Sequence, residues 1–425
     1  MSRLEVVRYA ALIVPVAALW LAVRFRPSDE QGDKRELGAL LLAGIAAFVG
    51  LGVLHELSRV TEWWTFAQVT GSWRGFPVDL WLGWAVLWGP LPVALRRHLG
   101  LPTAVMAAAW VDVVAMPAME PVVVLGDTWL WGEFAGLVGV LVPATLLGRW
   151  TADSTNLPAR VTLQMLVFTG LVFWLLPTVI FTLGDGSWTG LTDRSLVQLT
   201  MIVQLAAVLA LPGIAAVQEL ATQGRGTPYP WDPPSALVTT GPYAYVANPM
   251  QLSATLLLLL LAVLAGSWFL AAAAVGAVAF HAVLAGPHER EQLHARFGDG
   301  LDRYRHAVRP WWPRWRPNAQ QPATLFIDEG CNQCRQFGVA VAAARPVALE
   351  QRDARAYPGV ITRLRYQAGP HTNEGIAAAG RALEHLNLLA AAVGWTLRLP
   401  GLRVFFQLIA DTFGPAPHRV GERTP

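Results

Sequence analysis

The sequence has little charge, little cysteine and almost no lysine. Charged residues make up 14% of its 425 residues, whereas an average soluble protein has about 25%. Hydrophobic residues make up 54%, and the mean hydropathy is +0.40. This composition excludes an ordinary soluble enzyme and a disordered chain. A net charge of only +3 also excludes a nucleic-acid-binding chain, so no nucleic-acid partner is expected.

Long apolar runs fill most of the first 290 residues. A helix needs roughly 20 apolar residues to cross the hydrocarbon layer, and about nine runs qualify as candidates, which makes the lipid bilayer the expected partner. Only Gly266 and Ser267 separate the last two, which predicts a tight helical hairpin. No small-residue cleavage site follows the first run, so we expect a span rather than a secretory signal. The runs lie near residues 8–24, 37–55, 78–95, 101–124, 134–149, 160–183, 195–218, 251–265 and 267–286.

Arginine placement predicts the orientation of these spans, because cytoplasmic loops carry an excess of positive residues. After the last run come Arg290, Arg296, Arg303 and Arg305. We therefore expect a multi-pass protein of the inner (cytoplasmic) membrane, with the N-terminus outside and everything after residue 287 in the cytoplasm. The composition changes near residue 317. Three parts are predicted: a transmembrane bundle of unknown role (1–150), a second membrane domain (151–317) and a soluble domain (318–425).

Two polar motifs flank the predicted hairpin. A loop rich in glycine and proline reads Gly241-Pro-Tyr-Ala-Tyr-Val-Ala-Asn-Pro-Met-Gln251, and a charged helix reads His288-Glu-Arg-Glu-Gln-Leu293 after the second run. The hairpin brings both to one membrane face, with Tyr304 following. We expect a polar pocket there, where helix N-termini offer free N–H groups to an anion.

This pair of motifs resembles the isoprenylcysteine carboxyl methyltransferase family and the related phospholipid N-methyltransferases, over about residues 160–316. The resemblance implies S-adenosylmethionine in a cytoplasm-facing pocket and a lipophilic or membrane-anchored acceptor. It implies that the cofactor is bound by eight residues: Tyr243, Tyr245, Asn248, Pro249, Gln251, His288, Glu289 and Tyr304. Three positions depart from the family pattern, because Ala247 replaces an arginine, Gln251 a tyrosine and Arg290 a glutamate.

The two cysteines form a CxxC motif after a short apolar segment, Thr324–Asp328, which is typical of a buried strand. A helix is expected to follow, as are strands near 347–350 and 362–366 and helices near 374–393 and 400–411. CxxC between strand and helix is typical of a thioredoxin-like domain. The helix N-terminus would stabilise a thiolate at Cys331, and Cys334 would resolve a mixed disulfide. A zinc site needs two more ligands, so no metal is expected.

The tail, about residues 322–420, resembles the DCC-type thiol-disulfide oxidoreductases, whose motif is Asp-x-x-Cys-x-x-Cys. Asp328 matches the aspartate, whereas Glu329 stands where a glycine is usual. Pro370 is the nearest candidate for the proline that faces the cysteines in thioredoxins. The fold class expected is thus a polytopic all-α membrane protein of about nine transmembrane helices with a C-terminal soluble α/β thioredoxin-like domain.

The function expected is a membrane S-adenosylmethionine-dependent methyltransferase, coupled to a dithiol domain with catalytic Cys331 and Cys334 and a thiol or disulfide redox partner. The acceptor would be a thiol or a carboxylate. One alternative is a membrane-anchored thiol-disulfide oxidoreductase with a non-catalytic bundle, and another is a lipid-binding scaffold. In the first 150 residues, Asp112 and Glu120 are carboxylates on one side of an apolar helix, which is by default a functional-site hypothesis. The alternative is that Glu120 lies at the interface and Asp112 pairs with Ser, Thr or Trp.

Overall fold

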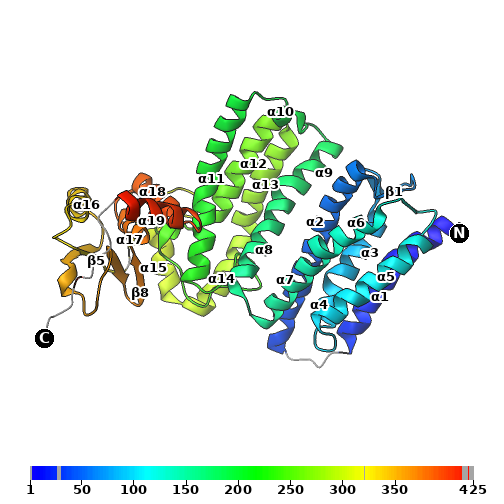
Figure 1. The fold of residues 1–425 in the computed structure, drawn as a ribbon, viewed down its shortest axis with the longest axis horizontal. Coiled ribbons are helices and arrows are strands. Elements are labelled where there is room, and N and C mark those ends of the chain that lie inside the picture. Colours follow the sequence, from blue (N-terminus) through cyan, green and yellow to red (C-terminus); the bar gives the residue numbers. More distant parts are fainter. Residues whose placement is uncertain (1, 26–29, 320, 414–419, 421–425) are drawn as a thin grey trace. The chain divides into compact units, whose positions relative to one another are not determined.

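The computed structural model describes residues 2–25, 30–319, 321–413 and 420, without the side chains of residues 30–33, 284, 285, 288, 289 and 292. Contacts divide the chain into two compact units. The first contains residues 1–179 and 226–233, and the second contains residues 180–225 and 234–425. Most of the described chain is helical, with a small sheet near the C-terminus (Figure 1).

All nine apolar runs contain helices, but they differ in length. Within the described ranges, six helices are long and apolar enough to cross a membrane, fewer than the nine spans expected. Three runs form shorter apolar helices: Val78–Ala94, Pro249–Ala265 and Trp268–Val283. The six long helices are Arg3–Arg24, Lys34–Thr61, Leu101–Ala118, Trp129–Asp153, Leu157–Leu183 and Leu196–Thr222. A further pair of apolar helices in the C-terminal part, Leu388–Arg398 and Leu402–Phe413, is bent by 91°.

The first unit is a helical bundle arranged around α2, which packs against α3, α4, α7 and α8. Its aromatic core contains Trp64, Trp81, Trp84 and Trp88, all buried. At one end, β1 pairs with β4 and β2 pairs with β3. Its elements are α1 (Arg3–Arg24), α2 (Glu30–Thr61), β1 (Trp64–Phe66), β2 (Ser72–Trp73), β3 (Phe76–Pro77), α3 (Val78–Trp88), α4 (Pro90–Ala94), α5 (Leu101–Ala118), β4 (Val123–Leu125), α6 (Trp129–Gly136), the π-helical turn η1 (Leu137–Leu141), α7 (Val142–Asp153), α8 (Leu157–Gly170) and the π-helical turn η2 (Leu171–Leu175).

The second unit begins within α9 (Leu176–Leu183) and continues with helices that pack side by side, α11 on α12 and α12 on α13. The hairpin turn predicted at Gly266-Ser267 is confirmed: Gly266 ends α12 in a left-handed conformation, and Ser267 caps α13. The elements are α10 (Thr189–Thr192), α11 (Leu196–Thr222), the 3₁₀ turn η3 (Gly241–Ala244), α12 (Pro249–Ala265), α13 (Trp268–Phe280), the π-helical turn η4 (His281–Ala285), α14 (Gly286–Phe297) and α15 (Asp299–Ala307).

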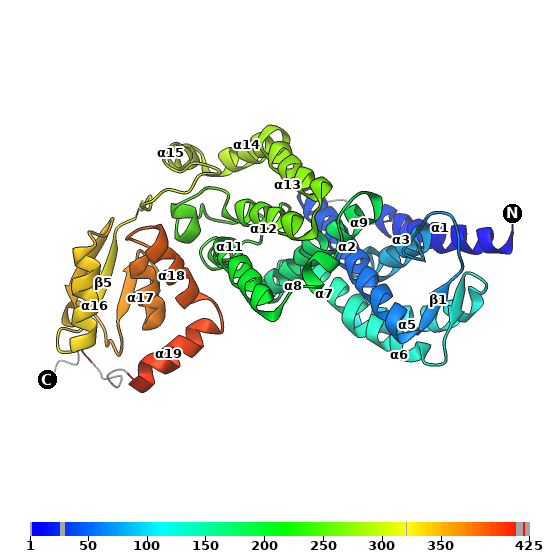
Figure 2. The ribbon, with the colours of Figure 1, turned by 90° about the horizontal axis from the view of Figure 1, so that it is seen from above.

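The C-terminal part of this unit contains a four-stranded sheet in the order β6-β5-β7-β8. Figure 2 shows strand β5 of this sheet beside α16. Strand β5 is parallel to β6 and antiparallel to β7, and β7 forms a hairpin with β8. Phe337 of α16 shares one core cluster with Leu325 of β5 and Ala378 of α17, so both helices cover the same face of the sheet. The elements are β5 (Ala323–Ile327), α16 (Asn332–Ala343), β6 (Leu349–Asp353), the 3₁₀ turn η5 (Ala354–Ala356), β7 (Arg365–Ala368), β8 (His371–Glu374), α17 (Ile376–Leu383), α18 (Leu388–Arg398) and α19 (Leu402–Phe413).

The expected strand, CxxC and helix order is present, with two differences. Residues 371–374 form β8, which the sequence analysis did not predict, and the helix expected near 374–393 is two helices, α17 and α18. Asn387 caps α18 by accepting a hydrogen bond from the Ala390 N–H, which explains the break between them.

Candidate functional site

The Gly-Pro-Tyr loop lies across the amino end of α12 and is buried. Gly241 has φ +60°, and a Cβ built on it would lie 3.2 Å from the Glu219 side chain, so glycine suits both the backbone and the space. Tyr243 and Tyr245 are buried. The loop also pairs with the linker that follows α15: the Ala247 N–H donates to the Arg309 carbonyl at 3.0 Å.

The hydroxyls of two predicted cofactor-binding tyrosines already have backbone partners. The Tyr245 hydroxyl donates to the Glu384 carbonyl at 2.8 Å, and the Tyr304 hydroxyl donates to the Tyr243 carbonyl at 2.9 Å. Burial raises the pKa of both phenols above the usual value, so both stay protonated donors. Through these hydrogen bonds, Tyr245 and Tyr304 help to hold the loop in its conformation.

Asn248 lies at the base of the hairpin, directly before Pro249, the first residue of α12. Its Nδ2 is 3.4 Å from Nε2 of His281, which follows α13, and the His281 ring packs edge-to-face on Trp311. His281 is a lone polar residue in an apolar run and was not among the predicted site residues. Gln251 is half-buried in the first turn of α12, and the side chains of His288 and Glu289 lie outside the described residues.

Polar atoms without partners lie next to this loop. Asn318 donates its backbone N–H to the Ala244 carbonyl, but its buried Nδ2 has no hydrogen-bond partner, and neither has the buried Nε of Arg305. A buried donor without a partner is costly. A ligand acceptor beside the loop would satisfy the free Nδ2 of Asn318.

Four charged side chains that the sequence analysis missed form a buried cluster behind the loop. Glu219 of α11 accepts hydrogen bonds from Arg381 at 2.7 and 3.0 Å and from Arg398 at 2.8 Å. Glu384 accepts from Arg381 at 3.1 Å and also from Arg398, and the Thr240 hydroxyl donates to Glu219. Burial opposes the charge on Arg381, but Glu219 and Glu384 outweigh it and hold its pKa above the usual value. The cluster joins α11 and the loop to α17 and α18.

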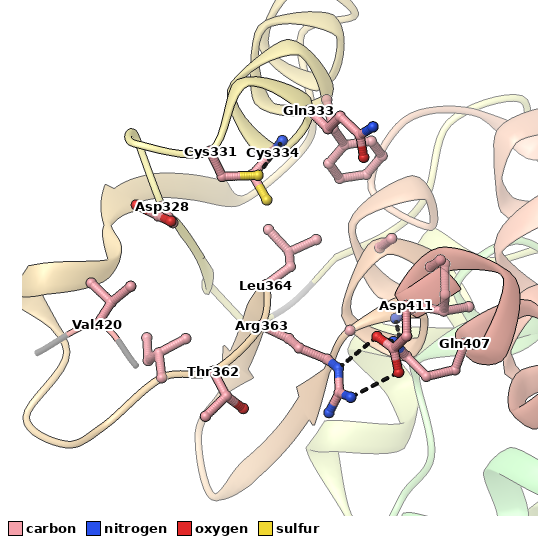
Figure 3. Close-up of a pocket in the computed structure, with 16 residues that line it drawn as sticks. Asp328, Cys331, Gln333, Cys334, Thr362, Arg363, Leu364, Gln407, Asp411 and Val420 are labelled. Atoms are coloured by element: carbon pink, nitrogen blue, oxygen red, sulfur yellow. Dashed lines mark hydrogen bonds and ion pairs between the residues drawn. The ribbon is translucent and has the colours of Figure 1, made fainter. Parts of the chain in front are cut away.

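The cysteines line a separate cavity of about 250 Å³ in the C-terminal part. Cys331 caps α16, and its sulfur accepts a hydrogen bond from the Cys334 N–H at 3.2 Å. Figure 3 shows the two sulfurs close together, facing Leu364, with Asp328 on one side. Burial and the neighbouring Cys331 raise the pKa of Cys334 to about 12.

The side of the cavity that faces the cysteines is formed by residues 361–364, not by Pro370, which lies in the β7–β8 turn and does not line it. At its far side, Arg363 pairs with Asp411 at 2.8 Å, and Gln407 also bonds to Asp411 (Figure 3). Most of the other lining residues are apolar. Within the described residues, no group of three or more His, Cys, Asp or Glu is placed to hold a metal ion.

Comparison with known protein families gives one match, which covers about a quarter of the chain. A family model described as phospholipid methyltransferase matches residues 199–299. The match spans nearly all of α11, the Gly-Pro-Tyr loop, the hairpin and α14. It supports a membrane methyltransferase, with the bilayer and a lipid-type substrate as the partners that such a family implies. No curated protein and no solved structure gave a significant match. The DCC-type resemblance of the tail has no support from these comparisons and stays a prediction.

Proposed function

We propose that this protein is an S-adenosylmethionine-dependent methyltransferase of the membrane that acts on a lipophilic or membrane-anchored acceptor. The observation that carries the proposal is the match to phospholipid methyltransferases over residues 199–299, which includes both polar motifs and the hairpin between them. The buried Nδ2 of Asn318 has no partner, and the Asn318 backbone N–H bonds to the same loop, which supports a polar cofactor there. The proposed location is the inner membrane, with this loop and the C-terminal part facing the cytoplasm.

Each part of the site has a role in this proposal. The cofactor supplies a methyl group on a sulfonium that is already a good leaving group, so the protein has little acid–base work to do. Asn248, His288 and Glu289 bind the cofactor, while Tyr243, Tyr245, Pro249 and Tyr304 hold the loop in shape and exclude water. Gln251, in the first turn of α12, contacts the cofactor.

Cofactor binding tests this proposal. Full-length protein in detergent is titrated with S-adenosylmethionine by calorimetry, alongside Asn248→Ala and Glu289→Gln. Both variants should bind at least ten-fold more weakly, because a hydrogen bond to a charged group contributes about 1.5–3 kcal/mol. Glu291→Gln is the matched control, since Glu291 is exposed on the same helix. Absence of binding by the unaltered protein would overturn the proposal, and binding equally tight in all variants would overturn the assigned roles.

The acceptor is identified by comparing lipid extracts of cells with and without the gene. A species lighter by one CH₂ should accumulate when the gene is deleted, and purified protein should convert it in the presence of S-adenosylmethionine. If no extracted species changes by one CH₂, the acceptor is not a lipid-soluble compound, and a membrane-anchored protein becomes the substrate to test.

A second candidate function rests on the cavity beside the cysteine pair. The C-terminal part has a parallel β5–α16–β6 unit with CxxC at its first strand-to-helix turn, continued by a hairpin and α17, which supports a thioredoxin-like domain. In the proposed reaction, the Cys331 thiolate attacks a disulfide of the partner and releases one partner thiolate. The Cys334 thiol then gives its proton to the released partner thiolate, and its sulfur attacks Cys331 and releases the second partner sulfur as a thiolate. The CxxC pair becomes a disulfide while the partner gains two electrons.

Coupling between the two activities has its own test. If the acceptor is a thiol that the tail keeps reduced, Cys331→Ser should lower methylation under oxidising conditions and leave it unchanged with added dithiothreitol. Equal methylation by Cys331→Ser in both conditions would show that the two activities are not coupled. The CxxC domain would then stand as an independent oxidoreductase, tested by reduction of a small disulfide such as oxidised glutathione.

A further inference from the structure

The first unit contains a small cavity that the methyltransferase and dithiol proposals do not use. Its volume is about 40 Å³. Of its ten lining side chains, five are aromatic, four are aliphatic and one is a carboxylate. The aromatic side chains and the carboxylate are Trp64, Phe66, Phe76, Trp84, Trp88 and Glu133, and we call this set the aromatic cage.

The carboxylate in the cage has no partner. Glu133 is 4% exposed, and its Oε1 accepts no hydrogen bond. Asp112 lies behind the cage: its Oδ2 accepts a hydrogen bond from Nε1 of Trp88 at 2.7 Å, whereas its Oδ1 has no partner. Glu133 is within electrostatic range of Asp112. In the part of the chain that the structure describes, no arginine, lysine or histidine forms an ion pair with either carboxylate.

Two buried carboxylates without a counter-ion are costly in an apolar bundle. Aromatic ring faces attract cations, and the attraction grows when the cation is desolvated. A positively charged ligand in the cage would pair with the free oxygen of Glu133 and contact the aromatic rings, because these residues line the cavity. From this geometry we infer that the first unit binds a primary ammonium group in the aromatic cage, with Glu133 as its direct ion-pair partner.

The size of the cavity favours a primary ammonium over larger cations. A water molecule needs about 10–15 Å³ of such volume, so the cage has room for about three waters. That space suits the NH₃⁺ end of an aliphatic amine, whereas a trimethylammonium head would have to displace the rings.

The cage lies at the end of the bundle where the short strands are. Trp64 and Phe66 belong to β1 and Phe76 to β3, and Glu133 lies in α6, which follows β4. Exposed Trp131 is at the same end, and exposed tryptophan is typical of the headgroup layer of a membrane. At this depth an amine can arrive from the headgroup of an aminophospholipid or from the water, and the experiment separates these two sources.

The full-length protein in nanodiscs of phosphatidylcholine is titrated with ethylammonium by calorimetry, at constant ionic strength in potassium phosphate. Binding is expected, with at least ten-fold weaker affinity for tetramethylammonium. Glu133→Gln keeps the shape of the side chain and should weaken ethylammonium binding at least ten-fold, as should Trp84→Leu. Asp127→Asn is the control, because Asp127 is exposed at the same end of the bundle, and it should bind as the unaltered protein does.

A second arm repeats the titration in nanodiscs that contain phosphatidylethanolamine. If the lipid headgroup is the natural source, ethylammonium affinity falls in these discs, and it stays the same if the source is a free amine. No ethylammonium binding by the unaltered protein in phosphatidylcholine discs would overturn the inference. Equal binding of ethylammonium and tetramethylammonium, or by Glu133→Gln and the unaltered protein, would also overturn it. No residue of the cage belongs to residues 199–299. Neither result therefore bears on whether the protein binds S-adenosylmethionine.

Discussion

Arg381 and Glu219 form a bidentate ion pair, although 162 residues separate them in sequence. Their exposed side-chain fractions are 6% and 1%. Glu219 belongs to α11, within the segment that matches phospholipid methyltransferases. Arg381 belongs to α17, which packs on the four-stranded sheet of the C-terminal part. The pair therefore fixes these two parts of the second unit to each other.

Removing one partner of this pair should loosen the junction. In Arg381→Met, Glu219 keeps Arg398 but loses two hydrogen bonds, and breaking a buried pair costs about 3–5 kcal/mol. The midpoint of thermal unfolding should fall, and limited proteolysis should cut between α15 and β5 sooner. Arg352→Met is the control, since the Arg352–Glu350 pair is exposed and should contribute little. An unchanged midpoint and cleavage rate for Arg381→Met would show that the pair does not hold the junction.

Much of the membrane part was predictable because its signals are local. Apolar runs indicated the six long and three shorter apolar helices of the described residues, and the Gly266-Ser267 turn indicated the hairpin. Six of the nine expected spans are long apolar helices in the described residues and three are shorter, because run length alone does not show where a helix bends or stops. Gly89, for example, interrupts the third run between α3 and α4.

The charge clusters were not predictable, because their members come from distant segments. Nothing local to Glu219 indicates that Arg381 and Arg398 will meet it. Asp112 was recognised from its apolar helix, and its hydrogen bond with Trp88 matches the alternative of a tryptophan partner. The carboxylate near it is Glu133 of α6, whereas Glu120 is exposed. Sequence spacing along one helix could not show this contact between helices.

Tyr245 contacts Glu384 and Trp395 of the C-terminal part, and we expect the loss of these two contacts to destabilise the protein to different extents. Tyr245→Phe removes the hydrogen bond to the Glu384 carbonyl but keeps the edge-to-face contact with Trp395, whose ring centroid lies 5.7 Å away. This change should cost about 1 kcal/mol of unfolding free energy, whereas Trp395→Ala should cost about 3–5 kcal/mol because it leaves a cavity. Denaturant unfolding followed by tryptophan fluorescence measures both. A larger loss for Tyr245→Phe than for Trp395→Ala would contradict this order.

The two cysteines should differ in reactivity. Because burial and the neighbouring Cys331 raise the pKa of Cys334 to about 12, Cys334 stays a thiol at neutral pH. The reduced protein is treated with iodoacetamide at about pH 8, below the usual thiol pKa of about 8.5, and the modified cysteine is located by mass spectrometry. Cys334→Ser should keep the fast-reacting sulfur, and Cys331→Ser should lose it. Faster modification of Cys331→Ser than of Cys334→Ser would reverse the assigned roles of the two cysteines.

His385 should make the stability of the C-terminal part decrease at acid pH. Its Nδ1 lies 2.7 Å from the Val347 carbonyl, which can only accept, so Nδ1 carries the proton and Nε2 accepts from the Tyr366 hydroxyl at 2.9 Å. Burial lowers the pKa of His385 below 6.5, although the Val347 bond and Glu384 oppose the shift. The unfolded chain therefore takes up the proton first. The stabilisation is complete above the unfolded pKa of about 6.5 and is lost as the pH falls through the lower folded pKa.

The midpoint of thermal unfolding of the full chain should therefore fall between about pH 7.5 and pH 5, a range that brackets the ordinary histidine pKa. His385→Asn keeps an N–H donor for Val347 but does not titrate there, so its midpoint should depend less on pH. His371→Asn is the matched control, because His371 is exposed on β8 of the same sheet, and it should keep the acid sensitivity. If His385→Asn shows the same pH dependence as the unaltered protein, another group is responsible for the acid sensitivity.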